Sequence, residues 1–323
     1  MREQIVIKEG IKKLKDTENE IKVLICLLLL GLLGYLVNSI DSGLDALFIA
    51  FILGIFVGYF LKIETKNSIE KVLKIILPVS IALYGFNIYV PTLNLEIETV
   101  LLTLLISSVI FISVYFVSLN IGNSKKLSIL LSCGSGICGV SAIAIVSSIV
   151  RPSKEEFSSA LIAITVIGLI CTILYPPTAK FLFPDKFYLL SGSTLPQTGL
   201  VKIASSVFGD EELAKALSVK AVRISMIAIV AFLLSFLYSE KGFYIPWFIV
   251  AFLTTAFLGS YFGNLGMVKT FSTILFASSL AGIGTTIELR EIYRGGMKPL
   301  VAVSIGMLLS FTFFFIIWRG GLI

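Results

Sequence analysis

The chain has 323 residues, of which 57% are hydrophobic and only 14% are charged, and it carries a formal net charge of +6. Soluble domains have about 45–50% apolar and about 25% charged residues, so this composition excludes an ordinary soluble enzyme and predicts an all-α polytopic membrane protein. There is no histidine, which removes histidine-based acid–base catalysis and most zinc sites, and we expect neither a metal nor a cofactor nor enzymatic activity.

Residues 1–20 are rich in charge and precede the first apolar run. They fit either an amphipathic helix on the cytoplasmic surface or a solvated basic tail. Apolar runs then follow one another almost to the end of the chain, each close to the roughly 20 residues with which a helix spans a bilayer. This pattern predicts a single transmembrane domain over residues 1–323, with about eleven transmembrane helices at 21–40, 44–61, 72–90, 99–119, 127–150, 157–180, 186–208, 211–238, 243–262, 268–289 and 298–319.

Lysine and arginine are distributed unequally between the loops on the two sides of these helices. Cytoplasmic loops of membrane proteins carry an excess of both residues, so the distribution predicts a cell-membrane protein with a cytoplasmic N-terminus and an external C-terminus. Because the charge is spread over loops, we expect the lipid bilayer and not nucleic acid as a partner. The outer loops then keep few basic residues: Arg151, Lys154, Lys215, Lys269 and Arg319.

The fifth predicted helix has a glycine-rich centre, in which Gly134, Gly136 and Gly139 lie beside Ser135 and Ser141. A glycine inside a helix costs roughly 1 kcal/mol relative to alanine. The cluster therefore predicts a helix that is interrupted inside the membrane. The alternative is close packing between helices, which also uses small residues.

The tenth predicted helix has a similar centre, formed by Gly282, Gly284, Thr285 and Thr286. It follows the fifth helix by five helices, and an odd number inverts the second copy relative to the first. The spacing predicts two inverted five-helix repeats, 44–180 and 186–319, with two interrupted helices that cross and with 21–40 as an additional helix. Glycine-interrupted helices in corresponding positions of two halves indicate a transporter site near the midplane.

Basic residues also occur inside predicted helices. Lys220 and Arg223 share one face of the eighth helix, and the apolar run after Arg223 is too short to span a bilayer by itself. Lys202 lies in the seventh helix, in a polar stretch that also contains Gln197 and Thr198. Ionisable residues in such places usually face a cavity, and snorkelling toward the headgroups is the alternative.

The sign of these charges favours an anionic ligand. The predicted helices hold no Asp or Glu near their middles, whereas Asp41, Asp45, Glu96 and Glu288 lie near helix ends. Basic side chains and the N-termini of half-helices both attract anions. We expect the substrate to contact the two glycine-rich centres and the basic residues with their neighbours: Gly134, Ser135, Gly136, Gly139, Ser141, Gln197, Thr198, Lys202, Lys220, Arg223, Gly282, Gly284, Thr285 and Thr286.

At these residues the chain resembles the YeiH-type sulfate exporter family of prokaryotic membrane proteins. The resemblance covers most of the chain and rests on CGSGICGVSAIA (133–144), on the Lys220–Arg223 segment and on Gly282-Ile283-Gly284 followed by Glu288-Leu289-Arg290. It implies the fold of the cation/proton antiporter and anion transporter superfamily, and a homodimer by analogy. Many relatives have an acidic residue where this chain has Pro196-Gln197, and Gln where it has Leu200, so proton coupling through that acid is not expected here.

Three functions remain open at this point. The first is a secondary transporter, acting as an exporter, of a small anion such as a sulfur oxyanion, an organic sulfonate or a carboxylate, with sodium or a proton as a coupling ion. The second is a sodium- or proton-coupled cation antiporter that uses backbone carbonyls at the helix breaks. The third is an intramembrane enzyme with Cys133 or Cys138 as the nucleophile, which lacks a histidine to activate it.

Overall fold

The computed structural model describes residues 2–41, 44–60, 63–87, 95–238, 247–262, 265–286 and 296–321. Within these ranges every regular element is helical, as predicted. The α-helices are α1 (Arg2–Ile40), α2 (Ala46–Phe60), α3 (Ile63–Tyr84), α4 (Ile97–Asn120), α5 (Lys125–Cys133), α6 (Val140–Val150), α7 (Lys154–Leu182), α8 (Phe187–Thr194), α9 (Thr198–Ser206), α10 (Asp210–Leu237), α11 (Trp247–Phe262), α12 (Gly266–Thr286) and α14 (Lys298–Arg319). A 3₁₀ turn, η1 (Gly85–Asn87), follows α3, and a π-helical turn, η2 (Gly134–Cys138), joins α5 to the break before α6.

The helices have the length and surface of membrane spans. In the described part of the chain, α4, α7, α10, α12, α14 and the segment Glu18–Ile40 of α1 are long and apolar enough to cross a bilayer. Large apolar side chains such as Ile173, Phe257 and Leu308 are exposed on the outside of the helix assembly. A surface of this kind is stable only in contact with lipid. The prediction of a polytopic membrane protein is confirmed.

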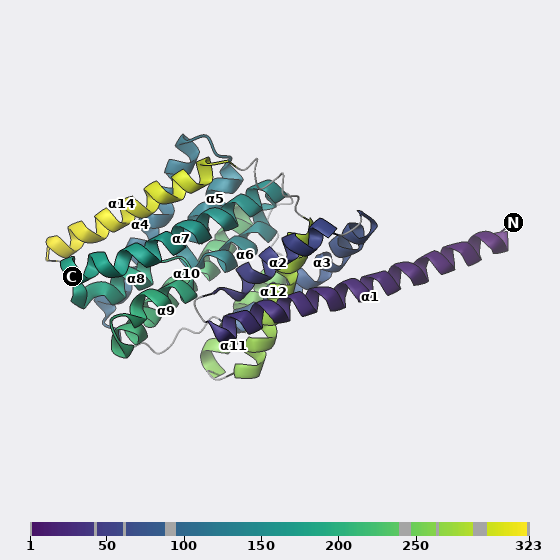
Figure 1. Ribbon diagram of the computed structural model, residues 1–323, viewed down its shortest axis with the longest axis horizontal. Coiled ribbons are helices and arrows are strands. Elements are labelled where there is room, and N and C mark those ends of the chain that lie inside the picture. Colours follow the sequence, from purple (N-terminus) through teal and green to yellow (C-terminus); the bar gives the residue numbers. More distant parts are fainter. Residues whose placement is uncertain are drawn as a thin grey trace.

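The helices form two bundles that lie side by side (Figure 1). In the flanking bundle, α12 packs against α1, α2 and α3, and α11 packs against α3. In the hairpin bundle, α10 packs against α8, α9, α4 and α6, and α14 packs against α4 and α7. Few contacts join the bundles, which meet mainly along α2, α6, α10 and α11.

Residues 2–40 form one uninterrupted helix, and its N-terminal half extends away from both bundles (Figure 1). The charged segment 1–20 and the predicted helix 21–40 are therefore continuous in residues 2–40, with no turn between them. Whether the first segment lies on the membrane surface stays a prediction.

The predicted break in the tenth helix is wrong. α12 runs without interruption through Gly282 and Gly284 to Thr286. A Cβ added at Gly284 would lie 2.3 Å from the carbonyl oxygen of Phe51 on α2, so the glycine lets the two backbones approach closely. The small residues of this helix serve packing, and residues 287–289 of the predicted span lie outside the described residues.

The fifth predicted helix is interrupted, and it also turns back. A straight helix from Lys126 to Arg151 would be about 40 Å long, yet Lys126 Nζ donates a 2.8 Å hydrogen bond to the carbonyl oxygen of Arg151. The Ser124 hydroxyl likewise bonds to Glu156. Residues 125–150 thus form a re-entrant hairpin, called the first hairpin below. The prediction that this segment crosses the membrane is wrong.

The seventh predicted helix, 186–208, is a second re-entrant hairpin. Its arms α8 and α9 are separated by Leu195, Pro196 and Gln197. Ser191 and Ser205 are joined by a 2.9 Å hydrogen bond between their hydroxyls, and the rings of Phe187 and Phe208 stack at 4.3 Å. Proline cannot donate a helical hydrogen bond, and here Pro196 coincides with the reversal. The prediction of one crossing helix is wrong for this segment.

The two hairpins enter from opposite ends of the molecule. The first begins beside the end of α4 and leads into the start of α7, whereas the second begins beside the end of α7 and leads into the start of α10. α7 has 29 residues and is therefore about 43 Å long, which separates the two ends. The interrupted segments are neighbours in the chain and not five helices apart, so the inverted repeats 44–180 and 186–319 are not confirmed.

Candidate functional site

The tips of the two hairpins meet at the centre of the hairpin bundle. Gly139 ends the first tip with φ 70° and ψ −125°, a conformation that side-chain-bearing residues rarely adopt. A Cβ at this position would lie 2.7 Å from Cγ of Gln197 and 3.3 Å from the carbonyl oxygen of Pro196. The contact between the tips therefore requires glycine.

Two basic residues of α10 hold both tips. Lys220 Nζ donates to the carbonyl oxygens of Ile137 at 3.0 Å, Leu195 at 2.8 Å and Pro196 at 2.7 Å. Arg223 donates from Nε to Gly136 and from Nη1 to Leu195, both at 2.7 Å. Each cation thus binds one carbonyl or more from each hairpin.

The electrostatics of this arrangement explain why two cations are stable inside a membrane protein. Both side chains are 0% exposed. The carbonyls that they bind end the first arm of each hairpin, where the helix dipole contributes about half a negative charge. Of these two side chains, Arg223 also has a nitrogen, Nη2, without a hydrogen-bond partner in the described part of the chain. The pair is therefore buried and does not snorkel to the headgroups, but it binds backbone and does not line the cavity described next.

The second arms of the hairpins begin at the tips with uncapped N-termini. The residues before α6 and α9 are Gly139 and Gln197, and neither forms a side-chain cap. The first N–H groups of a helix lack partners inside the helix. Ser141 on α6 and Thr198 and Gly199 on α9 line a common cavity, so two positive helix ends are directed to one place.

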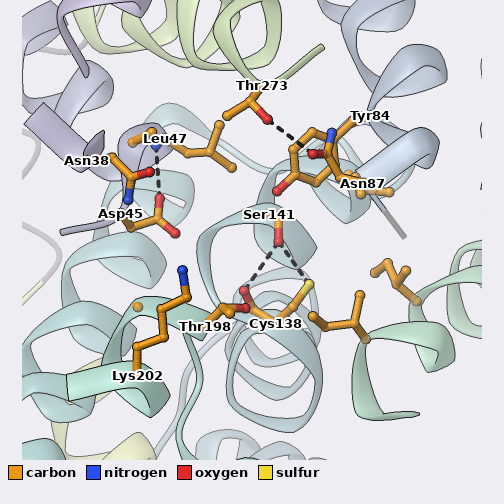
Figure 2. Close-up of a pocket in the computed structure, with 15 residues that line it drawn as sticks. Asn38, Asp45, Leu47, Tyr84, Asn87, Cys138, Ser141, Thr198, Lys202 and Thr273 are labelled. Atoms are coloured by element: carbon orange, nitrogen blue, oxygen red, sulfur yellow. Dashed lines mark hydrogen bonds between the residues drawn. The ribbon is translucent and has the colours of Figure 1, made fainter. Parts of the chain in front are cut away.

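The cavity has a volume of about 240 Å³ and lies between the two bundles (Figure 2). Its residues in the flanking bundle come from the end of α1, the start of α2, the end of α3 with η1, and the first half of α12. The hairpin-bundle wall consists of Cys138, Ser141, Ile145, Thr198, Gly199, Lys202, Ile224 and Ile227. The flanking-bundle wall consists of Asn38, Asp45, Ala46, Leu47, Tyr84, Asn87 and Thr273.

Lys202 is the cation of this cavity. It lies on α9, it is half-buried, and its ammonium group points into the space between the walls (Figure 2). In the part of the chain that the structure describes, no hydrogen bond or ion pair occupies it. Of the two alternatives for Lys202, the structure places it in the cavity.

The flanking wall carries the acid Asp45 and the amides of Asn38 and Asn87. Asp45 Oδ1 accepts hydrogen bonds from the backbone N–H groups of Leu47 at 2.9 Å and Phe48 at 3.0 Å and so caps α2. Asn87 donates to Ser272 at 2.6 Å and accepts from Thr273 at 3.2 Å. None of these wall residues was among the predicted site residues, and polar residues at the ends of apolar runs were the available signal for them.

The thiol of Cys138 lies on the hairpin wall beside Ser141. The Ser141 hydroxyl donates to the Cys138 carbonyl oxygen at 3.2 Å and approaches its Sγ at 2.9 Å. Cys133 is fully buried in the first hairpin. Cys133 thus occupies the position of a small hydrophobic residue, whereas Cys138 contributes its thiol to the cavity wall.

The structure divides the predicted site residues into three groups. Ser141, Thr198 and Lys202 line the cavity. The second group lies in or behind the tips, where Gln197 Nε2 donates to Thr165 Oγ1 at 3.0 Å: Gly134, Ser135, Gly136, Gly139, Gln197, Lys220 and Arg223. The third group packs inside the flanking bundle, away from the cavity: Gly282, Gly284, Thr285 and Thr286.

Comparison with known proteins identifies the family. Residues 22–303 match the family model described as Conserved hypothetical protein 698. The chain is 42% identical to a UPF0324 membrane protein of Archaeoglobus fulgidus, with 99% of each chain covered. It is 28% identical to a UPF0324 membrane protein of Listeria monocytogenes, covering 81% of this chain and 84% of the relative.

The UPF0324 inner membrane protein YeiH of Escherichia coli is 24% identical, over 80% of this chain and 81% of YeiH. No solved structure matches the chain. The expected resemblance to YeiH-type proteins is confirmed, and the protein belongs to the UPF0324 family of membrane proteins.

Proposed function

We propose that this protein is a secondary transporter that exports a small anion through the cavity between its two bundles. One observation supports this most strongly. Two uncapped half-helix N-termini, those of α6 and α9, and the unpartnered cation of Lys202 are directed into the same cavity. Each helix end supplies roughly half a positive charge, and broken helices that present N-termini to a substrate are a recurring feature of transporters.

The size of the cavity limits the substrate. Pockets for drug-sized ligands have volumes of about 300–1,000 Å³, whereas this one has about 240 Å³. A sulfur oxyanion, a short organic sulfonate or a short carboxylate fits these dimensions. Hydroxyls of Ser141 and Thr198 and backbone N–H groups are donors that such oxygens accept.

The division into two bundles supports alternating access by movement of one bundle against the other. The cavity lies toward the second-hairpin end. At the opposite end the bundles are joined by an edge-to-face contact of Phe51 with Phe157 at 5.9 Å and by an ion pair of Lys154 with Glu70 at 3.1 Å. Opening would then alternate between the two ends, with sodium or a proton as the coupling ion.

The first-hairpin end is the cytoplasmic side in this proposal. Because both hairpins are re-entrant, Arg151 and Lys154 lie on the side of the N-terminus, and Lys180 and Lys186 lie on the other side. Both assignments are the reverse of those expected with eleven crossing helices. Basic residues remain concentrated on the N-terminal side, which the positive-inside rule makes cytoplasmic. The C-terminus stays external because two hairpins change the count of crossings by an even number. A homodimer remains part of the proposal by analogy only.

The test is ligand-dependent stability of the purified protein in detergent, followed by flux in proteoliposomes. A ligand that binds only the folded state raises its apparent melting temperature. We expect a saturable shift with at least one of sulfate, sulfite, thiosulfate, ethanesulfonate and propionate. Lys202→Met should abolish the shift. The matched control Lys186→Met, outside the cavity at the base of the second hairpin, should retain it. If no anion produces a shift or a flux, the proposal is wrong.

Asp45 supports a second candidate, a sodium- or proton-coupled cation antiporter. Its carboxylate lies on the cavity wall, and such oxygens bind hard cations. This candidate predicts a shift with sodium or pH in the absence of any added anion, lost in Asp45→Asn and kept in Lys202→Met. An enzyme that uses Cys133 or Cys138 would lose activity in the double Cys→Ser variant, whereas we expect that variant to transport normally.

A further inference from the structure

The two walls of the cavity carry opposite charges. Lys202 lies on the hairpin-bundle wall and Asp45 on the flanking-bundle wall, and their charged groups point toward one another across the cavity (Figure 2). The ion pairs found among the described residues do not include one between them. The space between them therefore separates an acid and a base that form no ion pair in the described part of the chain.

A carboxylate is out of place in a site for a simple anion. The helix N-termini and Lys202 attract an anion, but the carboxylate of Asp45 on the opposite wall of the same cavity repels it. Capping of α2 does not require this charge, because Ser, Thr and Asn cap helices about as well as Asp. The acid on this wall needs a further explanation, and a ligand with a positive group supplies one.

The volume also suits a ligand with two groups. A water molecule occupies about 30 Å³ of liquid, and an inorganic oxyanion is only a few times larger. The cavity volume of about 240 Å³ therefore leaves space beside a single bound oxyanion. Asn38 and Tyr84 lie on the same wall as Asp45, and their oxygens are acceptors suited to an ammonium group.

We infer that the ligand of this cavity is a small zwitterion, a short amino sulfonate or amino carboxylate, whose anionic group binds at Lys202 and the two helix N-termini and whose ammonium group binds at Asp45. This inference rests on the proposed transport function and specifies its substrate class. Asp45 is then the residue that selects zwitterions over simple anions.

Matched pairs of ligands that differ in one amine provide the test. Affinities of the purified full-length protein in detergent would be measured by calorimetry for 2-aminoethanesulfonate against ethanesulfonate, and for 3-aminopropionate against propionate. We expect the aminated member of each pair to bind at least about tenfold more tightly. Asp45→Asn keeps the capping oxygen and removes the charge. This variant should abolish the preference without weakening ethanesulfonate, whereas Lys202→Met should weaken both members of each pair.

Controls separate this inference from the proposed function. Asp185→Asn, an exposed residue at the base of the second hairpin, should leave the preference unchanged. If Asp45→Asn lowers the melting temperature of the ligand-free protein, Asp45→Ser, which also caps helices, replaces it. Equal affinity for both members of each pair, unchanged by the Asp45 variants, would overturn the zwitterion and leave anion transport standing. Failure of every sulfonate and carboxylate to bind would overturn both proposals.

Discussion

The two hairpins reach the same point from opposite ends of the molecule, but they differ in what they contribute there. The tip of the first hairpin, 134–139, is glycine-rich and buried and carries no ionisable group except Cys138. The second hairpin carries Pro196 and Gln197 at its tip and Lys202 one turn later, on the cavity wall. The first hairpin therefore supplies backbone shape, whereas the second supplies shape and charge. Variants that affect one hairpin, or both, test this division.

The largest effect is expected from Arg223→Met, which affects both hairpins together. It leaves the carbonyl of Gly136 without its donor, and it leaves the carbonyl of Leu195 with Lys220 as its remaining donor. Removing the charged partner of a buried polar group costs several kcal/mol. We therefore expect Arg223→Met to lower the free energy of unfolding by about 3 kcal/mol or more. The measurement is the fraction of protein that survives heating in detergent, followed by size-exclusion chromatography.

A conservative variant and a lipid-facing control sharpen this prediction. Arg223→Lys keeps the charge but loses the planar fork that reaches two carbonyls, so it should be intermediate. Leu233 lies on the exposed face of the same helix, so the control Leu233→Ala should change stability little. An Arg223→Met protein as heat-resistant as the native one would show that α10 does not hold the tips.

The next effect concerns the first hairpin alone. Gly139→Ala places a Cβ 2.7 Å from Gln197 Cγ in a backbone conformation that favours glycine. Strain of this kind costs about 1–3 kcal/mol, and the clash adds to it. We expect a destabilisation of about 2–4 kcal/mol in the same heating assay. In a Gln197→Ala background the clash is relieved but the strain stays, so Gly139→Ala should cost less there than in the native protein. If Gly139→Ala cost nothing in that background, a strained backbone at this position would be contradicted.

A smaller effect is expected for the second hairpin. Gln197→Ala alone removes the hydrogen bond to Thr165 on α7 and leaves that hydroxyl buried. The loss should be about 1–2 kcal/mol, and Thr165→Val should produce a similar loss. In a double-mutant cycle, the effects of the two substitutions should be less than additive; strict additivity would mean that the bond does not stabilise the tip.

The hairpins also show how far the sequence determined the site. Composition and apolar runs were sufficient for the membrane class, and the cluster around Gly136 correctly predicted a break. The similar cluster around Gly284 did not form one, because the same small residues serve close packing of α12 against α2. What distinguishes the two cases is the partner across the interface, which no local pattern contains.

The apolar pattern of the sequence also does not predict that each hairpin reverses direction. Residues 187–206 together are as long as one spanning helix, and length alone does not distinguish a crossing from two half-length arms. Pro196 marked the second break, but the hydrogen bond between Ser191 and Ser205 that closes the hairpin joins residues on different arms. Likewise Asp45 was placed near a helix end, and only the packing of the two bundles brings it opposite Lys202.

The smallest effect on stability is expected where the first-hairpin end meets the flanking bundle. Lys154 and Glu70 are about half-exposed, and ion pairs of this kind contribute about 0–1 kcal/mol. Their importance in our proposal is positional, because they join the two bundles at the end opposite the cavity. Glu70→Cys with Lys154→Cys, in a background with Cys26, Cys133, Cys138 and Cys171 replaced by Ser, should leave the melting temperature nearly unchanged. A short bis-maleimide should then stop transport by fixing the bundles at this end.

The control for this cross-link is a pair within one bundle. Glu20→Cys with Lys71→Cys joins α1 to α3, which are ion-paired at 3.3 Å inside the flanking bundle, and its cross-linking should leave transport intact. If both cross-links spare transport, the bundles do not separate at the first-hairpin end and alternating access must occur elsewhere. If both stop it, the flanking bundle itself changes shape during transport. Movement of the hairpin bundle as one body, with its two tips held together by Lys220 and Arg223, predicts one result. Cross-linking of the first pair stops transport, and cross-linking of the second pair leaves it intact.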